Sequence, residues 1–209
     1  MTTKLILVRH AKSIFNEEGV YPLSGPCKGL SDLGLKQAKL IADRLKDMKI
    51  DVIFSSPRKR VLQTAEEINK YHNISIIESE KILDMDYGVM AGKTSSLNKM
   101  PPEQRDIFEK RNSDENFRIP DGESYNDMKK RIKEFIQQIM NKYKDKTILI
   151  VCHKSTIRVI TSVIMNKPHE EVYRNMKGAD NTSYSEIDVD NNGNPDIITY
   201  ACDNHLKNL

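Results

Sequence analysis

Two patterns of apolar and polar residues alternate along this chain. Short, mainly apolar runs occupy residues 4–8, 51–54 and 147–152, as is typical of strands buried on both faces of a sheet. Longer stretches with helical spacing come between and after these runs. The alternation predicts an α/β fold with three α/β/α layers and a mainly parallel central sheet.

Cap residues place the starts of three helices. Ser31 is a suitable N-cap for the first, and Ser56 followed by Pro57 is a good start for the second. Ser124 begins the longest helix. The apolar positions that give these helices a buried face are residues 38, 41, 42, 45 and 48 in the first, 61, 65 and 68 in the second, and 125, 128, 132, 135, 136, 139 and 143 in the third.

The remaining segments are less regular. Residues 74–77 and 81–83 read as edge strand or loop, and 157–164 as a helix, while 183–189 and 197–200 read as a closing pair of strands joined by a turn. We expect one domain over residues 1–209. Its small insertion covers approximately 89–120, has a short helix after Pro102, and lies as a lid over the carboxyl ends of the strands.

Charge and composition exclude several classes of protein. The 33 Lys and Arg residues nearly balance 30 acidic ones, for a net charge of +3, and 6% aromatic content without Trp offers few stacking surfaces. We therefore expect no nucleic-acid partner. No apolar run approaches the roughly 20 residues that span a bilayer, so we expect no membrane partner. Cys27, Cys152 and Cys202 form no disulfide framework or zinc motif, and we expect a reducing cytoplasm.

Basic side chains follow the three buried strands. Arg9 and His10 come after the first, Arg58 after the second, and His153 after the third. In a parallel sheet the carboxyl ends of the strands open onto one edge, where ligands bind. Two arginines there favour a phosphate or carboxylate, and a neutral imidazole is a competent nucleophile toward phosphorus. These groups could neutralise a phosphoryl group without magnesium, so we expect no metal and no other cofactor.

Five ordered blocks resemble the histidine phosphatase superfamily, the phosphoglycerate mutase-like group. Residues 7–16, LVRHAKSIFN, resemble its L-x-R-H-G-x-T-x-x-N signature. Residues 30–38 look like its L-[ST]-x-x-G-x-x-Q-A stretch, and 55–65 like its S-S-P-x-x-R-x-x-Q-T-A segment, with Arg60 and Gln63-Thr64-Ala65. Residues 120–124 resemble P-x-G-E-S, and 151–158 resemble V-S-H-G-x-x-I-R.

The resemblance implies roles for particular residues. His10 would take the phosphoryl group, and Arg9, Asn16, Arg58 and His153 would form the phosphate pocket. The family's catalytic acid is usually a Glu four residues before a Gly, and Asp84 falls on that position. Asp86 is the competing candidate for the proton donor.

Several positions depart from the family pattern. Ala11 and Lys154 stand where a Gly usually follows each histidine, so the edge of the pocket differs and Lys154 adds a charge beside it. Residues 22–27, in a loop that tends to line the substrate entrance in the family, lack the usual G-W-x-D pattern. Specificity is therefore hard to carry over from the family.

The leading hypothesis is a phosphatase for small phosphorylated metabolites, in which Asp84 protonates the leaving oxygen and water later hydrolyses the phosphohistidine. A phosphoglycerate-type phosphomutase is the second. The third is a phosphate-ligand-binding regulatory protein that has lost catalysis, suggested by the Asp at the acid position, Ala11 and Lys154. The sequence leaves the physiological substrate and the oligomeric state open.

Overall fold

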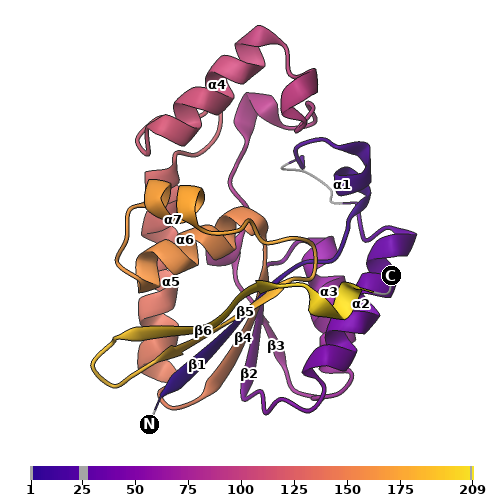
Figure 1. Ribbon diagram of the computed structural model, residues 1–209, viewed down its shortest axis with the longest axis vertical. Coiled ribbons are helices and arrows are strands. Elements are labelled where there is room, and N and C mark those ends of the chain that lie inside the picture. Colours follow the sequence, from indigo (N-terminus) through magenta and orange to yellow (C-terminus); the bar gives the residue numbers. More distant parts are fainter. Residues whose placement is uncertain (1, 24–27, 208) are drawn as a thin grey trace.

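A six-stranded sheet forms the centre of the molecule (Figure 1). The structure is a computed structural model that describes residues 2–23, 28–207 and 209. The order across the sheet is β3-β2-β4-β1-β5-β6, and the strands are β1 Thr3–Arg9, β2 Val52–Ser55, β3 Ile76–Glu78, β4 Thr147–Cys152, β5 Tyr184–Val189 and β6 Pro195–Cys202. The first four are parallel, and β5 and β6 add an antiparallel edge. The predicted fold class is confirmed.

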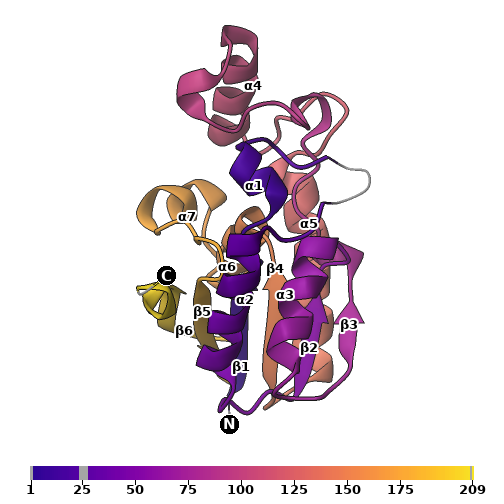
Figure 2. The same cartoon turned by 90° about the vertical axis from the view of Figure 1, so that its right-hand side faces the viewer.

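Helices cover both faces of the sheet, as the turned view shows (Figure 2). α2 Asp32–Leu45 and α3 Lys59–Asn69 pack on one face, and α5 Tyr125–Lys142 and α6 Lys154–Ile164 on the other. Successive residues of β1 point to opposite faces. Leu5 and Leu7 therefore join the core under α5, whereas Ile6 and Val8 join the core under α2 and α3. This two-sided burial accounts for the mainly apolar runs of the sequence.

Three further helices lie beyond the carboxyl ends of the parallel strands (Figure 1). They are α1 Ile14–Glu18, α4 Pro102–Ser113 and α7 His169–Asn175. The sequence predicted the helix after Pro102 but neither of the other two, which are only five and seven residues long. Short 3₁₀ turns at Glu80–Ile82, Gly88–Met90 and Leu97–Lys99 occupy the chain between β3 and α4, and a fourth at Asn204–Leu206 follows β6.

Two of the three predicted helix starts are confirmed. The Ser31 hydroxyl accepts a hydrogen bond from the Gly34 N–H, which caps α2. Ser124 and Asp127 form a capping box at the start of α5, each side chain bonded to the other residue's backbone N–H. These caps satisfy backbone donors that have no partner within the helix itself.

The predicted start of α3 is wrong. The helix begins at Lys59 with Arg58 as its N-cap residue, so Ser56 and Pro57 lie outside it. The Ser56 hydroxyl instead lies 2.9 Å from Nε2 of His153, and the Ser56 N–H bonds the Val151 carbonyl. The Ser56 backbone and side chain thus bond Val151 of β4 and His153 after it, so the hydroxyl does not cap α3.

The described helices include none that is both long and apolar enough to cross a membrane. Residues 24–27, which hold Cys27 and most of the loop that departs from the family pattern, lie outside the described residues.

Substitution of Gly34 tests the close packing of α2 against the backbone of the loop after β1. A Cβ at this position would lie 1.9 Å from the Lys12 carbonyl oxygen. Ala normally stabilises a helix relative to Gly by about 0.5–1 kcal/mol. We expect Gly34→Ala instead to lower the free energy of unfolding by about 1–3 kcal/mol, because the Lys12 backbone must move. Urea denaturation measures the change. Lys36→Ala, on the exposed side of the same helix, should stay within about 0.5 kcal/mol of wild type. Unchanged or increased stability of Gly34→Ala would contradict this packing.

Candidate active site

Two histidines meet at the carboxyl edge of the sheet. β4 lies between β1 and β2, so the residues that follow β1 and β4 are neighbours. The His10 N–H donates to the Cys152 carbonyl at 3.0 Å, and the centroids of the His10 and His153 rings are 5.4 Å apart. Both side chains are buried. The structure thus brings together the two histidines that the sequence places 143 positions apart in the numbering.

The guanidinium of Arg60 bridges these histidines. Its Nε lies 3.2 Å from Nε2 of His10, and one of its terminal nitrogens lies 3.1 Å from Nδ1 of His153. The Arg60 side chain is 3% exposed, so these contacts take place away from bulk water. α3 supplies Arg60 from its first turn, immediately after the chain leaves β2.

The Arg60 contacts determine which nitrogen of each histidine carries the proton. A guanidinium can only donate hydrogen bonds, so both ring nitrogens that face it are acceptors. The proton of His10 then lies on Nδ1, which donates to the Ala11 carbonyl at 2.7 Å. The proton of His153 lies on Nε2, which donates to the Ser56 hydroxyl at 2.9 Å. The lone pair of Nε2 of His10 is therefore directed at the Arg60 guanidinium.

Both histidines are held neutral. Burial lowers the pKa of His10 well below its ordinary value, and the positive charges of Arg60 and Arg9 add to the effect together with His153. Burial is also the largest cause of the lowered pKa of His153, followed by the charges of Arg60 and Arg58. A neutral imidazole is the form that can act as a nucleophile or accept a proton.

Asp84 is the carboxylate nearest to this group. One of its oxygens lies 3.7 Å both from a terminal nitrogen of Arg60 and from Nδ1 of His153. The other accepts a short hydrogen bond from the Ser155 hydroxyl. Asp86 is exposed, and its carboxylate accepts a hydrogen bond from the Gly88 N–H. Of the two acids that the sequence left in competition, Asp84 is the one beside the histidines.

The backbone around Asp84 is fixed by Arg131 of α5. The Arg131 guanidinium donates to the carbonyls of Lys81, Leu83 and Asp84 at 2.8, 3.0 and 3.0 Å. It also pairs with both carboxylate oxygens of Glu123, at 2.8 and 2.9 Å. Sequence reasoning missed Arg131, because nothing in helical spacing shows that a polar residue reaches back to carbonyls about 50 positions earlier.

Arg9 and Asn16 line the same pocket as His10. Arg9 donates to the Ala179 carbonyl at 2.9 Å, and burial lowers its pKa to about 10. The side-chain oxygen Oδ1 of Asn16 accepts from the Ser13 N–H at 3.1 Å and lies 3.3 Å from the Asn181 side-chain nitrogen. That same Asn181 nitrogen donates to the His10 carbonyl at 2.9 Å. Asn16 is therefore connected to the backbone of His10.

Arg58 lies beside this group of residues. It lines an adjoining pocket of about 390 Å³, together with Arg60 and Asp84, and does not line the pocket that contains His10. The arginine between the histidines is Arg60. The motif itself held the signal, since the arginine of S-S-P-x-x-R falls on residue 60 of this chain.

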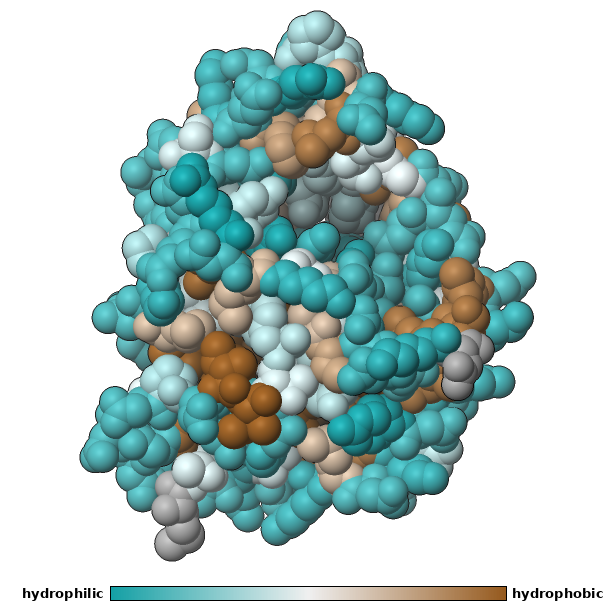
Figure 3. Space-filling model, in the orientation of Figure 1, coloured by the Kyte–Doolittle hydropathy of each residue, from teal (hydrophilic) through white to brown (hydrophobic). Residues whose placement is uncertain are grey.

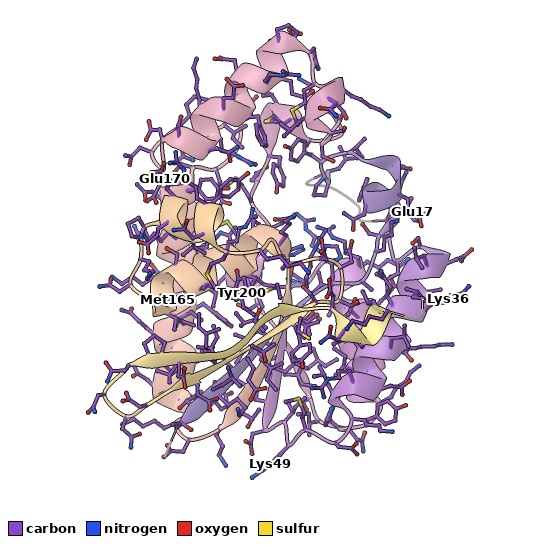
Figure 4. All side chains as sticks on the ribbon, in the orientation of Figure 1. Glu17, Lys36, Lys49, Met165, Glu170 and Tyr200 are labelled. Atoms are coloured by element: carbon purple, nitrogen blue, oxygen red, sulfur yellow. The ribbon has the colours of Figure 1, made fainter. Side chains whose placement is uncertain are left out.

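The pocket over His10 has a volume of about 310 Å³. Figure 3 shows the surface hollowed below the α4 region, and in Figure 4 nitrogen-bearing side chains gather there between α1 and α6, with Glu17 on α1 and Glu170 on α7 at either side. Beyond the histidines the pocket is lined by aromatic side chains and by cations of α4 and α6. These are Phe15, Tyr21, Tyr87, Phe108, Tyr125, Tyr173, Arg111, Lys154 and Arg158.

Arg111 is buried among these rings. Its guanidinium carbon lies 5.1 Å from the ring centroid of Phe108, 5.7 Å from that of Tyr125 and 5.9 Å from that of Tyr87. The described residues contain no group of three or more His, Cys, Asp or Glu side chains arranged to hold a metal ion. The pocket therefore presents arginines, lysine and imidazole to a ligand, which is a lining suited to an anion.

Comparison with known proteins finds phosphatase relatives and solved structures of the same fold. The chain is 34% identical over 194 residues to phosphoserine phosphatase 1 of Hydrogenobacter thermophilus, covering 91% of this chain and 89% of that one. Bacillus stearothermophilus YhfR has the same fold, with a TM-score of 0.86 at 24% identity over 98% of this chain and 100% of that one. A mutant of phosphoserine phosphatase from Entamoeba histolytica, solved in complex with phosphoserine, has a TM-score of 0.82 at 23% identity over 98% and 99% of the two chains.

The family comparison extends over nearly the whole sequence. The model of the histidine phosphatase superfamily (branch 1) matches residues 5–202, a span that includes His10, Arg60, Asp84 and His153. This chain belongs to the histidine phosphatase superfamily, branch 1.

Proposed function

We propose that this protein is a phosphatase that hydrolyses small phosphate monoesters through a phosphohistidine on Nε2 of His10. The observation that carries the proposal is the neutral, buried imidazole whose lone pair faces a guanidinium in an anion-binding pocket. Membership of the histidine phosphatase superfamily and the phosphoserine phosphatase relative support phosphatase activity.

In the first step Nε2 of His10 attacks phosphorus in line with the departing ester oxygen. The N–P bond forms as the P–O ester bond breaks, and Asp84 in its protonated form delivers a proton to the leaving alkoxide. The Ala11 carbonyl accepts a hydrogen bond from the Nδ1–H of His10 and thereby stabilises the reactive tautomer, with the lone pair on Nε2. Ser155, which donates to the other carboxylate oxygen, would keep the proton-bearing oxygen of Asp84 toward the histidines.

In the second step water attacks the phosphohistidine. The N–P bond breaks, the ionised Asp84 accepts a proton from the attacking water, and inorganic phosphate leaves. The enzyme then returns to neutral His10 and protonated Asp84, so that one monoester and one water give one alcohol and one phosphate.

The non-bridging oxygens of the phosphoryl group would be held by Arg9, Arg60 and Asn16, and His153 would donate to one of them only when its Nδ1 carries a proton. Arg60 is best placed, because it already donates toward the nucleophilic nitrogen, and a phosphoryl oxygen there would accept the same N–H group. Arg58 would act from the adjoining pocket, through its charge. Arginines that neutralise the equatorial oxygens supply most of what phosphoryl transfer requires.

The nucleophile is tested by phosphate release from p-nitrophenyl phosphate with EDTA present. We expect wild-type activity to survive EDTA and His10→Ala to lose at least about 1,000-fold in kcat, because the covalent route disappears. Acid-labile phosphate trapped on wild-type protein during turnover, and absent from His10→Ala, is the second readout. Full activity of His10→Ala would overturn the mechanism. Conversion of 3- to 2-phosphoglycerate that depends on a bisphosphate primer would favour the phosphomutase instead.

The proton donor is tested with two leaving groups. Asp84→Asn should slow hydrolysis of an alkyl phosphate such as phosphoserine by about 100- to 10,000-fold, since the alkoxide needs a proton. It should affect p-nitrophenyl phosphate far less in the first step, because nitrophenolate departs without one. Asp86→Asn is the matched control and should retain activity on both esters. A leaving-group-dependent loss in Asp86→Asn rather than Asp84→Asn would reverse the assignment.

The two arginines at the start of α3 are distinguished by Arg→Lys substitutions. Arg60→Lys keeps the charge but cannot bridge two histidines, and we expect kcat/KM to fall by about 100-fold or more. For Arg58→Lys we expect kcat/KM to fall by less than about 10-fold. Arg58 would act through its charge, which Lys keeps, and would not need the planar geometry of a guanidinium. Steady-state kinetics on one ester measures both variants. Equal losses would show that Arg58 also contacts the phosphoryl group.

A further inference from the structure

A second group of cations lies in the same pocket, on the first turns of α6. Lys154 is the first residue of α6, directly after His153, and Arg158 follows four positions later on the same side of the helix. Both line the pocket that contains His10. Like charges at this spacing are unfavourable by a few tenths of a kcal/mol on an isolated helix. A bound anion would offset the repulsion between Lys154 and Arg158.

The charged ends of these two side chains converge on Gly178. A Cβ at Gly178 would lie 2.8 Å from Cε of Lys154, 3.0 Å from its Nζ, and 3.0 Å from a terminal nitrogen of Arg158. A side chain at this position would displace the ends of both groups. Gly178 thus lets an ammonium and a guanidinium lie against the same stretch of backbone, next to each other.

Neither cation is paired with a carboxylate among the ion pairs of the described residues. Arg158 is held by Tyr173, whose ring centroid is 4.3 Å from the guanidinium carbon, and its Nε is buried with no hydrogen-bond partner in the described part of the chain. Burial lowers the pKa of Lys154, and the charges of Arg9 and Arg158 lower it further, against the opposing effect of Asp180. An anion bound between Lys154 and Arg158 would relieve this repulsion.

The charges that line the pocket lead to the same conclusion. Asp84 is the single acid among the described lining residues, whereas the cations are Arg9, Arg60, Arg111, Lys154 and Arg158. A phosphoryl dianion beside His10 would be matched by Arg9 and Arg60. The charges of α6 would remain unmatched unless the substrate carries a second negative group.

We propose that Lys154 and Arg158 form a second anion subsite, which binds a carboxylate on the organic part of the substrate. The substrate class is then a short phosphorylated carboxylic acid, and this assignment rests on the proposed phosphatase function. A carboxylate fits because a planar oxyanion can accept from the guanidinium of Arg158 and from the ammonium of Lys154 together. The pocket of about 310 Å³ has room for a small acid of this kind.

The test compares two esters that differ at one group. 3-Phosphoglycerate has a carboxylate where glycerol 3-phosphate has a hydroxymethyl group. We expect Lys154→Gln and Arg158→Gln each to lower kcat/KM for 3-phosphoglycerate by about 10- to 100-fold, as for a lost hydrogen bond to a charged group. The same variants should change glycerol 3-phosphate hydrolysis by less than about 3-fold. Lys177→Gln is the matched control, because Lys177 is exposed and pairs with Asp203 outside the pocket.

A binding measurement separates this subsite from the chemistry. In the His10→Ala background, calorimetry should give a dissociation constant for 3-phosphoglycerate that rises about 10-fold or more on adding Lys154→Gln. An unchanged constant, or equal losses for both esters, would overturn the subsite. Selective loss with propane-1,3-diyl bisphosphate instead of 3-phosphoglycerate would overturn the carboxylate assignment. Selective binding of 3-phosphoglycerate without turnover would confirm the subsite while refuting the phosphatase function.

Discussion

The candidate site depends on the buried guanidinium of Arg60, which lies between its two histidines. Removing a charge from water costs several kcal/mol, and burial is tolerated only where hydrogen-bond acceptors surround the cation. Arg60 finds them on His10 and His153, at 3.2 and 3.1 Å. Those acceptors must be neutral imidazoles. The arrangement that stabilises the buried cation therefore also keeps both imidazoles in their reactive, neutral state. The outward nitrogens of both rings then need partners of their own, and the Ala11 carbonyl and the Ser56 hydroxyl supply them.

Much of the fold followed from periodicity in the sequence. β1, β2 and β4 are buried on both faces, so their residues are mainly apolar, and such runs are easy to detect. α2 and α5 carry a regular apolar stripe and a serine cap. α1 and α7 could not be found this way, because five or seven residues complete too few turns to show a period. The helix start placed at Ser56 was wrong for a different reason: the hydroxyl that suits an N-cap bonds His153 instead.

Topology alone predicted the candidate site to the level of strand ends and no finer, and the motif resemblance added Asp84 and Asn16. The carboxyl ends of parallel strands meet at one edge whatever their side chains, so the meeting of His10 and His153 needs only the topology. Arg58 is the extended N-cap residue of α3, whereas Arg60 lies in its first turn and faces the histidines. The strand-end argument pointed to Arg58 because it follows β2 closely, and it could not show that a residue inside the next helix reaches the same edge.

Asp84 is held in place in a different way from Lys154 and Arg158. Around Asp84, rigidity comes from a hydrogen-bond network. Arg131 donates to the carbonyls of Lys81, Leu83 and Asp84 and pairs with Glu123, so α5 fixes the backbone of the acid from outside the pocket. Around Lys154 and Arg158, the groups are positioned by their helix and by the absence of a side chain at Gly178, while their charges have no carboxylate to hold them among the described ion pairs. A network of satisfied bonds resists rearrangement, whereas an unmatched pair of cations gains stability only when an anion arrives. The rigid network around Asp84 suits a proton transfer that is the same for many esters. The cations Lys154 and Arg158 suit selection among substrates, because cations that only a ligand neutralises contribute their electrostatic attraction to binding that ligand.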